Sequence, residues 1–321
     1  MLNAMFYFTL MLGICVMMTG KTWFSIWLGL EINLLSFLPI ILLSANNTME
    51  GGLKYFLIQA IASLILLQTS FTWFLLPSPE LFILTPISLK LGMAPLHFWL
   101  PDIVKNLNWV LNLVLLTAQK IGPMYLLSTV GATYKLFLAT VGALSVVVGA
   151  IGGLNEMDMR KLMAFSSISH MGWMAIGAML TTSLWALYLL TYIFISSALM
   201  TAFYKMNVNY MSQLTLKNKD GMFIMVLFLS LGGFPPLLGF APKWAILMKT
   251  SDLSLSLTAV LILTSVLTLF YYIRASLAAT SLSSSNPSMT VPPHTSSLSV
   301  LTCTNILGGG LYMLMWSSSM L

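Results

Sequence analysis

Apolar runs long enough to cross a lipid bilayer recur along most of this sequence, with short polar segments between them. A helix needs about 20 mostly apolar residues to cross the hydrocarbon core, whereas the strands of a membrane barrel alternate apolar and polar residues over about 10 positions. The runs here are continuous and longer than such strands. Charged residues make up 7% of the chain, against about 25% in a soluble domain. The sequence therefore predicts an all-α polytopic membrane protein.

Eleven apolar segments are candidates for membrane-spanning helices. They cover approximately residues 3–19, 24–44, 55–77, 83–100, 108–130, 137–153, 162–180, 184–206, 222–247, 255–275 and 298–316. The last segment follows a connector at 276–297 that is rich in Ser, Thr, Asn and Pro, a composition typical of irregular structure. No loop is large enough to fold as a separate soluble domain. We therefore expect residues 1–321 to form one membrane domain.

Basic residues in the loops predict the orientation of the chain. An odd number of spans places the two termini on opposite sides of the membrane. The loops on the N-terminal side then hold eight basic residues, namely Lys54, Lys105, Arg160, Lys161, Lys205, Lys217, Lys219 and Arg274, and the other loops hold three, namely Lys21, Lys135 and Lys249. Because basic loops stay on the negative side, we expect the N-terminus there, which is the matrix side in a mitochondrion.

Five ionisable residues inside the predicted spans are the candidates for a functional role: Glu31, Lys90, Lys120, His170 and Lys243. A lysine near the centre of a bilayer costs about 2.5–3.5 kcal/mol on insertion scales, so such residues persist where they pair, line water or carry ions. Desolvation favours the neutral form of a lysine, and a nearby carboxylate favours the charged form. A buried lysine whose partner can move is therefore suited to take up and release protons.

Structural interpretations of the same residues stay open. Lys120 and Lys243 lie near the ends of their segments, from which a long side chain can reach the membrane surface. Glu31 is too short to do so. His170 is equally compatible with a core histidine bonded to a backbone carbonyl group.

Depth in the membrane predicts which of these residues meet. Segments 24–44 and 83–100 run in the same direction, and Glu31 and Lys90 lie at the same position within them, about 10 Å from one edge. They are candidates for an ion pair. Lys120 lies about 18 Å from the other edge of a core about 30 Å thick. We expect these residues to form a row near the middle of the membrane.

A short motif occurs twice, each time beside one of the lysines. LGMAP at 91–95 follows Lys90, and LGFAP at 238–242 precedes Lys243. Proline breaks a helix, and broken backbone at membrane depth is tolerated where it is buried in protein or lines water. The motifs lie 239 − 92 = 147 residues apart, across five spans, so the copies would have opposite orientations. Paired broken helices of this kind are typical of inverted-repeat transporters.

The sequence offers no cofactor site of its own. It has no GxGxxG before a helix, and its two cysteines, Cys15 and Cys303, have no metal-ligand spacing. We expect neither a metal nor a redox cofactor on this chain. The net charge of +6 is spread over short loops without a basic, aromatic-bearing patch, so no nucleic-acid partner is expected.

Six segments together resemble the antiporter-like membrane subunits of the mitochondrial NADH:ubiquinone oxidoreductase, respiratory complex I, in their animal-type form. In chain order they are WLGLEINLLSF, KYFLIQAIAS, KLGMAPLHFWLPD, LLTAQKIGPM, GGLNEMDMRKLMAFSSISHMGW and LSLGGFPPLLGFAPKW. The resemblance covers roughly residues 20–275. It implies half-repeats at about 24–130 and 137–275 and a further C-terminal helix at 298–316. It also implies a multi-pass chain of the mitochondrial inner membrane.

The resemblance further implies roles for the buried residues. Glu31 resembles the carboxylate that pairs with Lys90 of the first broken helix. Lys120 resembles the central lysine of a proton path and Lys243 the terminal lysine near its exit, while His170 lies where polar residues connect the two halves. Quinone reduction elsewhere in the complex would drive proton translocation through this relay. The expected partners are other membrane-arm subunits, among them neighbouring antiporter-like subunits, and membrane lipids.

Two other functions stay open at this stage. A stand-alone antiporter that exchanges Na⁺ or K⁺ for H⁺ would carry the same helices and lysines, but it would be active without other subunits. A mainly structural membrane subunit of complex I would keep its buried charges without moving protons. Neutral substitutions at Glu31 and Lys120 would then leave proton pumping unchanged.

Overall fold

The computed structural model of the chain describes residues 2–44, 49–72, 79–214, 221–280, 302–306 and 308–310. Within these residues the regular structure is helical, apart from an isolated antiparallel bridge between Asp158 and Tyr210. This confirms the predicted all-α class. Most of the connector predicted at 276–297 and of the span predicted at 298–316 lies outside the described residues.

Fourteen helices follow one another in the described part of the chain between residues 2 and 280. They are α1 (Leu2–Thr19), α2 (Trp23–Leu42), α3 (Met49–Phe71), α4 (Pro79–Leu91), α5 (Trp99–Asn106), α6 (Trp109–Leu116), α7 (Ala118–Gly131), α8 (Lys135–Gly153), α9 (Met159–Leu180), α10 (Thr182–Met206), α11 (Met211–Leu214), α12 (Gly221–Gly232), α13 (Phe240–Ser251) and α14 (Leu255–Thr280). Several bounds differ from the prediction. Helix α3 covers Met49–Phe71 rather than 55–77, α5 continues to Asn106 beyond the span predicted at 83–100, and α14 continues to Thr280 rather than ending at 275.

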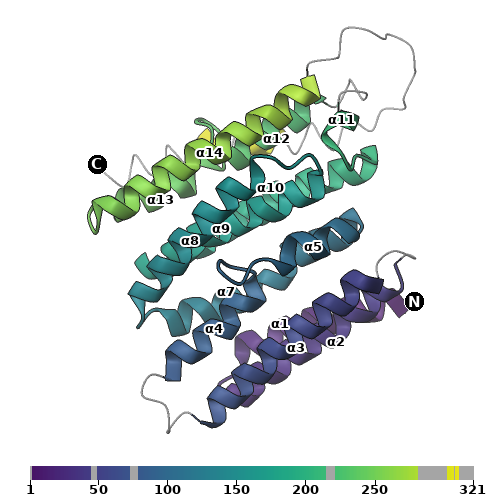
Figure 1. Ribbon diagram of the computed structural model, residues 1–321, viewed down its shortest axis with the longest axis vertical. Coiled ribbons are helices and arrows are strands. Elements are labelled where there is room, and N and C mark those ends of the chain that lie inside the picture. The colour runs from purple at the N-terminus through teal and green to yellow at the C-terminus, as the bar shows by residue number, and fades with distance from the viewer. Residues whose placement is uncertain are drawn as a thin grey trace.

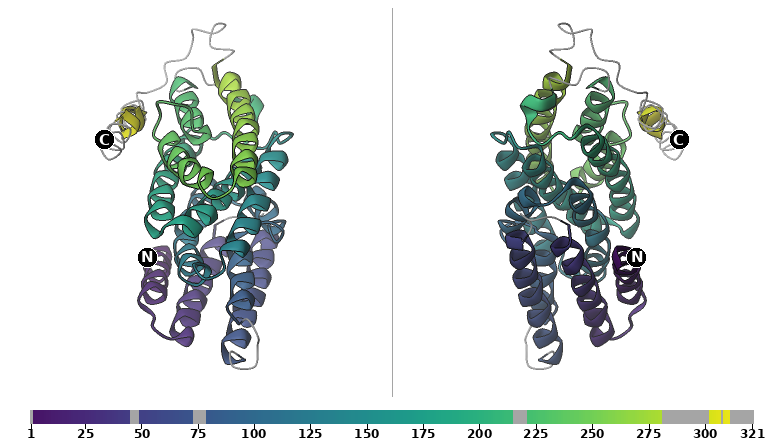
Figure 2. Two further views of the ribbon diagram at one scale, coloured as in Figure 1. Left: turned by 90° about the vertical axis from the view of Figure 1, so that its left-hand side faces the viewer. Right: turned by 90° about the vertical axis from the view of Figure 1, so that its right-hand side faces the viewer.

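The long helices lie roughly parallel and are stacked along the long axis of the molecule (Figure 1). Helices α1–α3 form one end of the stack and α12–α14 form the other, with α8–α10 between them, as the side views also show (Figure 2). Since the helices cross the membrane, the long axis of the stack lies in the membrane plane. Buried residues of successive helices can therefore form a row along that plane.

Six helices in the described part of the chain are long and apolar enough to cross a membrane. They are α2, α3, the pair α6–α7, α8, α10 and α14, while α1 and α12 are apolar but shorter. The chain is therefore polytopic, although these helices are fewer than the eleven predicted spans. Breaks divide two of the predicted spans into short helices, and α9 carries charged residues, a histidine and several serines that lower its hydropathy.

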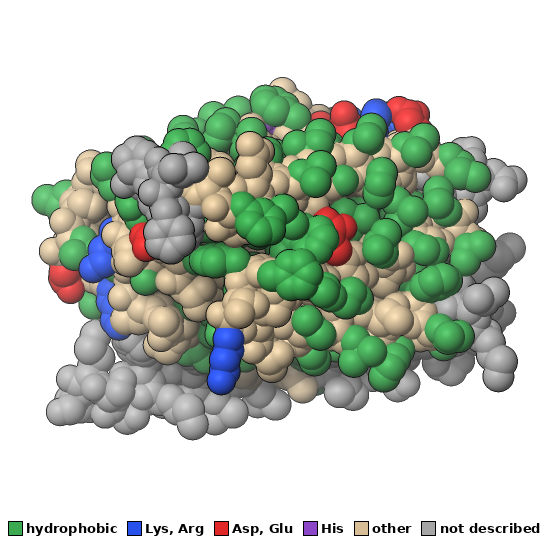
Figure 3. Space-filling view, turned by 90° about the horizontal axis from the view of Figure 1, so that it is seen from below, with side chains coloured by type: hydrophobic (Ala, Val, Ile, Leu, Met, Phe, Trp, Pro, Cys, Tyr) green, Lys and Arg blue, Asp and Glu red, His purple; other side chains and the backbone are tan. Residues whose placement is uncertain are grey.

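The outer surface of the stack is strongly apolar. Leu64, Phe71, Leu255 and Leu263 expose between 63% and 80% of their surface. Hydrophobic side chains cover much of the face shown in Figure 3, and most of its charged side chains lie near the edge. A broad apolar surface of this kind is suited to contact with lipid or with other membrane chains rather than with water.

Helices α8 and α9 approach closely because glycines line their contact. A Cβ atom on Gly172 would lie 2.6 Å from the carbonyl oxygen of Gly142, and a Cβ atom on Gly149 would lie 2.6 Å from the backbone nitrogen of Ser169. Side chains cannot approach so closely, whereas glycines let two membrane helices gain packing contacts along their backbones. This contact fixes α9, which carries His170, against its neighbour.

Both predicted helix breaks are present, and the same local structure forms them. Helix α4 stops before Gly92 and α12 before Gly233, and the φ angles of these glycines are +70° and +81°. In each case the N–H group of the glycine donates to the carbonyl oxygen of the residue three positions earlier. The N–H group of the residue after the glycine donates to the carbonyl oxygen of the residue five positions before itself. This is the Schellman motif, in which glycine readily takes the left-handed conformation.

The two LGxAP segments are not equivalent, which corrects the alignment made from the sequence. LGMAP contains the glycine of the first break, whereas LGFAP follows the second break and leads into α13. The equivalent glycines, Gly92 and Gly233, are 233 − 92 = 141 residues apart rather than 147. Consequently Lys90 lies in the helix before its break, and Lys243 lies in the helix after its break.

A third interruption, which the sequence analysis missed, precedes Lys120. Helix α6 ends at Leu116 and α7 begins at Ala118, with Thr117 between them at φ −119° and ψ −76°. The N–H of Lys120 bonds to the carbonyl oxygen of Thr117. Each of the three buried lysines therefore lies within a few residues of a helix end.

Candidate functional site

Lys90 occupies the last turn of α4, beside the first break, and is 9% exposed. Its Nζ donates a hydrogen bond of 3.2 Å to the backbone carbonyl oxygen of Gln59 in α3. A cation at the carboxyl end of a helix is also favoured by the helix dipole. The break therefore gives Lys90 a buried position with one acceptor and a favourable field.

Glu31 lies in α2 and is half-buried. It forms no direct ion pair with Lys90. The ion pairs within the described ranges join Lys54 to Glu50, Arg160 to Asp158 and Lys161 to Glu156. The carboxylate is nevertheless close enough for its charge to act on Lys90. The expected ion pair is thus corrected to a longer-range electrostatic contact.

Lys120 lies in the first turn of α7 and is 4% exposed. Its Nζ has no hydrogen-bond partner among the described residues. The side chain does not reach the surface, so the interpretation of Lys120 as a snorkelling residue is not supported. A buried ammonium group without an acceptor is costly. The position is therefore better suited to a proton that arrives and leaves than to a permanent charge.

His170 lies in the middle of α9, is 4% exposed and is surrounded by tyrosines. Its Nδ1 lies 2.8 Å from the hydroxyl oxygen of Tyr188 in α10, and its Nε2 lies 3.5 Å from that of Tyr272 in α14. The ring of Tyr192 packs on the imidazole with the ring centroids 5.1 Å apart. The alternative of a histidine bonded to a backbone carbonyl group is not found, because both ring nitrogens face hydroxyl groups.

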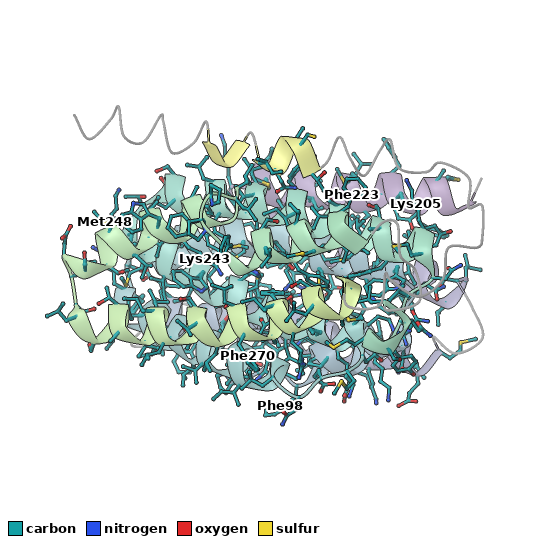
Figure 4. The ribbon with its side chains drawn as sticks, turned by 90° about the horizontal axis from the view of Figure 1, so that it is seen from above. Phe98, Lys205, Phe223, Lys243, Met248 and Phe270 are labelled. Atoms are coloured by element: carbon teal, nitrogen blue, oxygen red, sulfur yellow. The ribbon has the colours of Figure 1, made fainter. Side chains whose placement is uncertain are left out.

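Lys243 lies in α13 and is 5% exposed. Its Nζ donates to the carbonyl oxygens of Gly232 at 2.9 Å and Leu231 at 3.4 Å, at the end of α12. The same atom lies 5.8 Å from the ring centroid of Trp173, within the range of a cation–π contact. Lys243 lies among the helices rather than at their ends (Figure 4). This position excludes the interpretation of a lysine that snorkels to the surface.

His170 connects Lys120 and Lys243 electrostatically, because the charges of both lysines act on it. A cavity of about 10 Å³ adjoins the imidazole, lined by His170 and Tyr188 and, across it, by Ser230 near the end of α12. A volume of about 10–15 Å³, measured for the centre of a water molecule, is the smallest that holds one water. A small space at this lower limit, with an apolar accessible lining, therefore lies beside His170.

The five predicted residues form two groups. Glu31 and Lys90 interact by charge, and His170 interacts by charge with Lys120 and Lys243. Within the described part of the chain, no hydrogen bond joins any of the five to another. Protons passing along the row therefore need intervening polar groups.

The sequence analysis missed three partners of these residues, namely Gln59, Tyr188 and Tyr272. Tyr188 and Tyr272 have polar-tipped side chains inside apolar spans, and that position was the available signal. Gln59 acts through its backbone carbonyl group, which no side-chain pattern reveals. No group of three or more His, Cys, Asp or Glu side chains suited to hold a metal occurs in the described ranges.

The fold and the site together define a class of protein. It is a polytopic helical membrane protein in which interrupted helices hold buried lysines, an arrangement typical of ion-coupled transporters. The sequence matches the transmembrane family described as NADH:quinone oxidoreductase/Mrp antiporter over residues 20–78 and 75–268. The chain belongs to this family.

Individual relatives are similar over nearly their whole length. NADH-ubiquinone oxidoreductase chain 2 of Anopheles gambiae is 38% identical over 290 residues, which cover 85% of this chain and 84% of that one. Chain 2 of Locusta migratoria is 35% identical over 292 residues, which cover 87% and 85%. A chain of the respiratory complex I from Thermus thermophilus with bound aureothin shares the fold, with a TM-score of 0.86 at 24% identity over 97% of this chain and 78% of that chain.

Proposed function

We propose that this chain is a proton-translocating subunit in the membrane arm of an NADH:ubiquinone oxidoreductase, respiratory complex I, of the mitochondrial inner membrane. Its membership of the family and its similarity to proteins named chain 2 of that enzyme support the proposal. Quinone reduction takes place on other subunits, and this chain carries no redox centre. Its partners are other membrane-arm subunits, including neighbouring antiporter-like subunits, and membrane lipids.

The observation that carries the translocation proposal is the environment of Lys120. This lysine is buried in the middle of the stack, and its Nζ lacks a partner among the described residues. A lysine retained only for structure would be expected to have an acceptor or a counter-ion. A group that is charged during only part of a cycle has no such requirement. Lys120 is therefore the central proton carrier of the proposed relay.

Hydrogen bonding gives the relay a direction. The ammonium group of Lys243 is held by two carbonyl oxygens, whereas that of Lys120 has none. The carbonyl oxygens beside Lys243 offer an arriving proton acceptors that Lys120 lacks, so the proposed direction is from Lys120 towards Lys243. His170, on which the charges of Lys120 and Lys243 both act, passes the proton from one lysine to the other.

The contact between Glu31 and Lys90 controls this transfer. Redox energy reaches the chain as a change of charge or hydration at this pair. The field at Lys120 then changes, and the proton moves on through His170 to Lys243. Because Glu31 and Lys90 interact by charge without a direct bond, their separation can change without breaking one.

We also infer eleven membrane crossings with the N-terminus on the matrix side. The interrupted pairs α4–α5 and α12–α13 and the polar helix α9 each occupy one predicted span, which supports more crossings than the six continuous apolar spans. Two half-repeats of opposite orientation, at about 24–130 and 137–275, form the single membrane domain 1–321. The C-terminal helix predicted at 298–316 lies mostly outside the described residues, so the eleventh crossing stays a prediction.

An independent cation/proton antiporter is the second candidate, because the family description includes Mrp antiporters. Sealed vesicles that contain the intact complex distinguish the two functions. We expect proton uptake that starts with NADH and stops with quinone-site inhibition, and none driven by a Na⁺ or K⁺ gradient alone. Proton flux driven by a cation gradient without NADH would favour the antiporter.

A further inference from the structure

The geometry around His170 points to Tyr188 as a positioning residue of the relay. We propose that the hydroxyl group of Tyr188 holds the imidazole with Nδ1 as the bonded nitrogen and leaves Nε2 as the nitrogen that exchanges hydrogen-bond partners. This inference rests on the proposed function, because it concerns how His170 passes protons. It assigns a role to a residue outside the five relay residues.

The hydroxyl group of Tyr188 fixes the tautomer of the neutral imidazole. Tyr188 is 2% exposed, and within the described ranges its hydroxyl group has no hydrogen-bond partner other than Nδ1 of His170, at 2.8 Å. A buried hydroxyl proton without an acceptor is costly. The hydroxyl group therefore donates to Nδ1, and the ring proton of neutral His170 is on Nε2.

Nε2 is held much more loosely than Nδ1. Its distance to the hydroxyl oxygen of Tyr272 is 3.5 Å, at the outer limit of a hydrogen bond. Nδ1 of the imidazole is thus held firmly by a residue of α10, whereas Nε2 is held weakly by a residue of α14. The weakly held N–H can exchange its partner at little cost, whereas the ring as a whole stays in place.

Protonation of His170 changes the direction of the Tyr188 bond without breaking it. A proton that arrives from Lys120 adds to Nδ1, the ring nitrogen without a proton, and the hydroxyl group of Tyr188 rotates to accept from the new N–H. When Nε2 then releases its proton towards Lys243, Nδ1 keeps the new proton and the hydroxyl group goes on accepting; it rotates back when the ring proton returns from Nδ1 to Nε2. A tyrosine hydroxyl can play both parts, which a purely donating or purely accepting group cannot.

Tyr192 provides a matched control on the same helix. Its ring contacts His170 at 5.1 Å between centroids, and the residue is 2% exposed like Tyr188. Its hydroxyl group, however, forms no hydrogen bond with His170. Replacing either tyrosine with phenylalanine removes one buried hydroxyl group from the same cluster, but only Tyr188→Phe removes a bond to His170.

The experiment compares Tyr188→Phe and Tyr192→Phe in the assembled complex, in this chain or in a relative with the same residues. The readouts are the pH profile of NADH:ubiquinone turnover and the number of protons pumped per NADH. The hydrogen bond to the charged imidazolium is stronger than that to the neutral ring, so its loss makes His170 harder to protonate. We expect Tyr188→Phe to lower pumping about two- to tenfold and to move the profile to lower pH by about 0.3–1 unit. The charged and titratable groups that face His170 stay in place in this variant, namely Tyr192, Tyr272, Lys120 and Lys243.

Tyr192→Phe is expected to leave both readouts unchanged. The inference is overturned if the pH profile of an assembled Tyr188→Phe complex does not move, or if both variants move it equally, because general packing would then explain the effect. His170→Gln and Lys120→Met separate this outcome from a failure of the proposed function. If these two variants abolish pumping while Tyr188→Phe behaves like Tyr192→Phe, only the positioning role fails. Normal pumping in His170→Gln would overturn the relay through His170 itself.

Discussion

The ammonium group of Lys243 closes the break in its own span, because its Nζ donates to the carbonyl oxygen of Gly232 at 2.9 Å. Lys243 lies in the helix after the break and Gly232 ends the helix before it. The last carbonyl groups of a helix have no partner within that helix. The lysine therefore serves as a cap for the end of α12.

Loss of this cap predicts a defect in both stability and transport. Lys243→Met leaves the carbonyl oxygens of Gly232 and Leu231 without their donor, which removes about 1.5–3 kcal/mol per strong bond to a charged group. We expect a lower midpoint of thermal inactivation of the assembled complex and a loss of pumping. Lys249→Met, at an exposed position of the same helix, is the control and should change neither. Normal pumping in Lys243→Met would remove this residue from the relay.

Gly233 is predicted to be intolerant of a side chain. Its φ angle is +81°, and a Cβ atom there would lie 2.9 Å from Cδ of Lys243. Gly233→Ala therefore combines a left-handed backbone penalty of about 1–2 kcal/mol with displacement of the lysine. We expect reduced thermal stability and slower proton pumping.

The neighbouring residue provides the control for this substitution. A Cβ atom on Gly232 would meet Tyr272 at 3.4 Å, which is an ordinary contact, and Gly232 does not have a positive φ angle. Gly232→Ala should therefore be much milder than Gly233→Ala. Equal effects of the two substitutions on pumping would mean that the position of Lys243 beside the break is unimportant.

Glu31 is predicted to act through its charge alone. Glu31→Gln keeps the size of the side chain but removes the field that stabilises the charged form of Lys90, so pumping and coupled turnover should fall several-fold. Glu31→Asp keeps the charge and should retain most activity, because no direct bond has to be preserved. Glu50→Gln, in an exposed pair with Lys54, is the control and should be neutral. If Glu31→Gln were as active as this control, the proposed input to the relay would be wrong.

Much of the fold follows from two properties that can be assessed from the sequence, namely the length of the apolar segments and the free-energy cost of placing a charge in lipid. Apolar length predicts membrane helices, and the cost of a charge in lipid singles out residues such as Glu31 and Lys120 as unusual. The glycines and prolines also predicted that two spans are broken. These inferences succeed because each depends on local composition and on the membrane as solvent.

The pairings between helices could not be predicted in the same way. The acceptor of Lys90 is a backbone carbonyl group of α3, and the acceptor of the Tyr188 hydroxyl group lies on α9, so both depend on which helices pack together. The repeated LGxAP motif was misleading because the breaks follow the glycine conformation at Gly92 and Gly233 rather than the motif. Sequence spacing alone does not show that one lysine lies before its helix break and the other lysine after its break.

The most direct test of the account is proton pumping per NADH oxidised in a complex that carries Lys120→Met, with quinone-linked NADH oxidation measured in the same membranes. Lys135→Met, at the exposed start of α8, is the control for the loss of a lysine from this chain. The account predicts that Lys120→Met loses pumping and slows coupled oxidation while the complex remains assembled, and that Lys135→Met behaves as the unmodified complex. Normal pumping and normal oxidation in assembled Lys120→Met would show that this buried lysine is structural and would contradict the account.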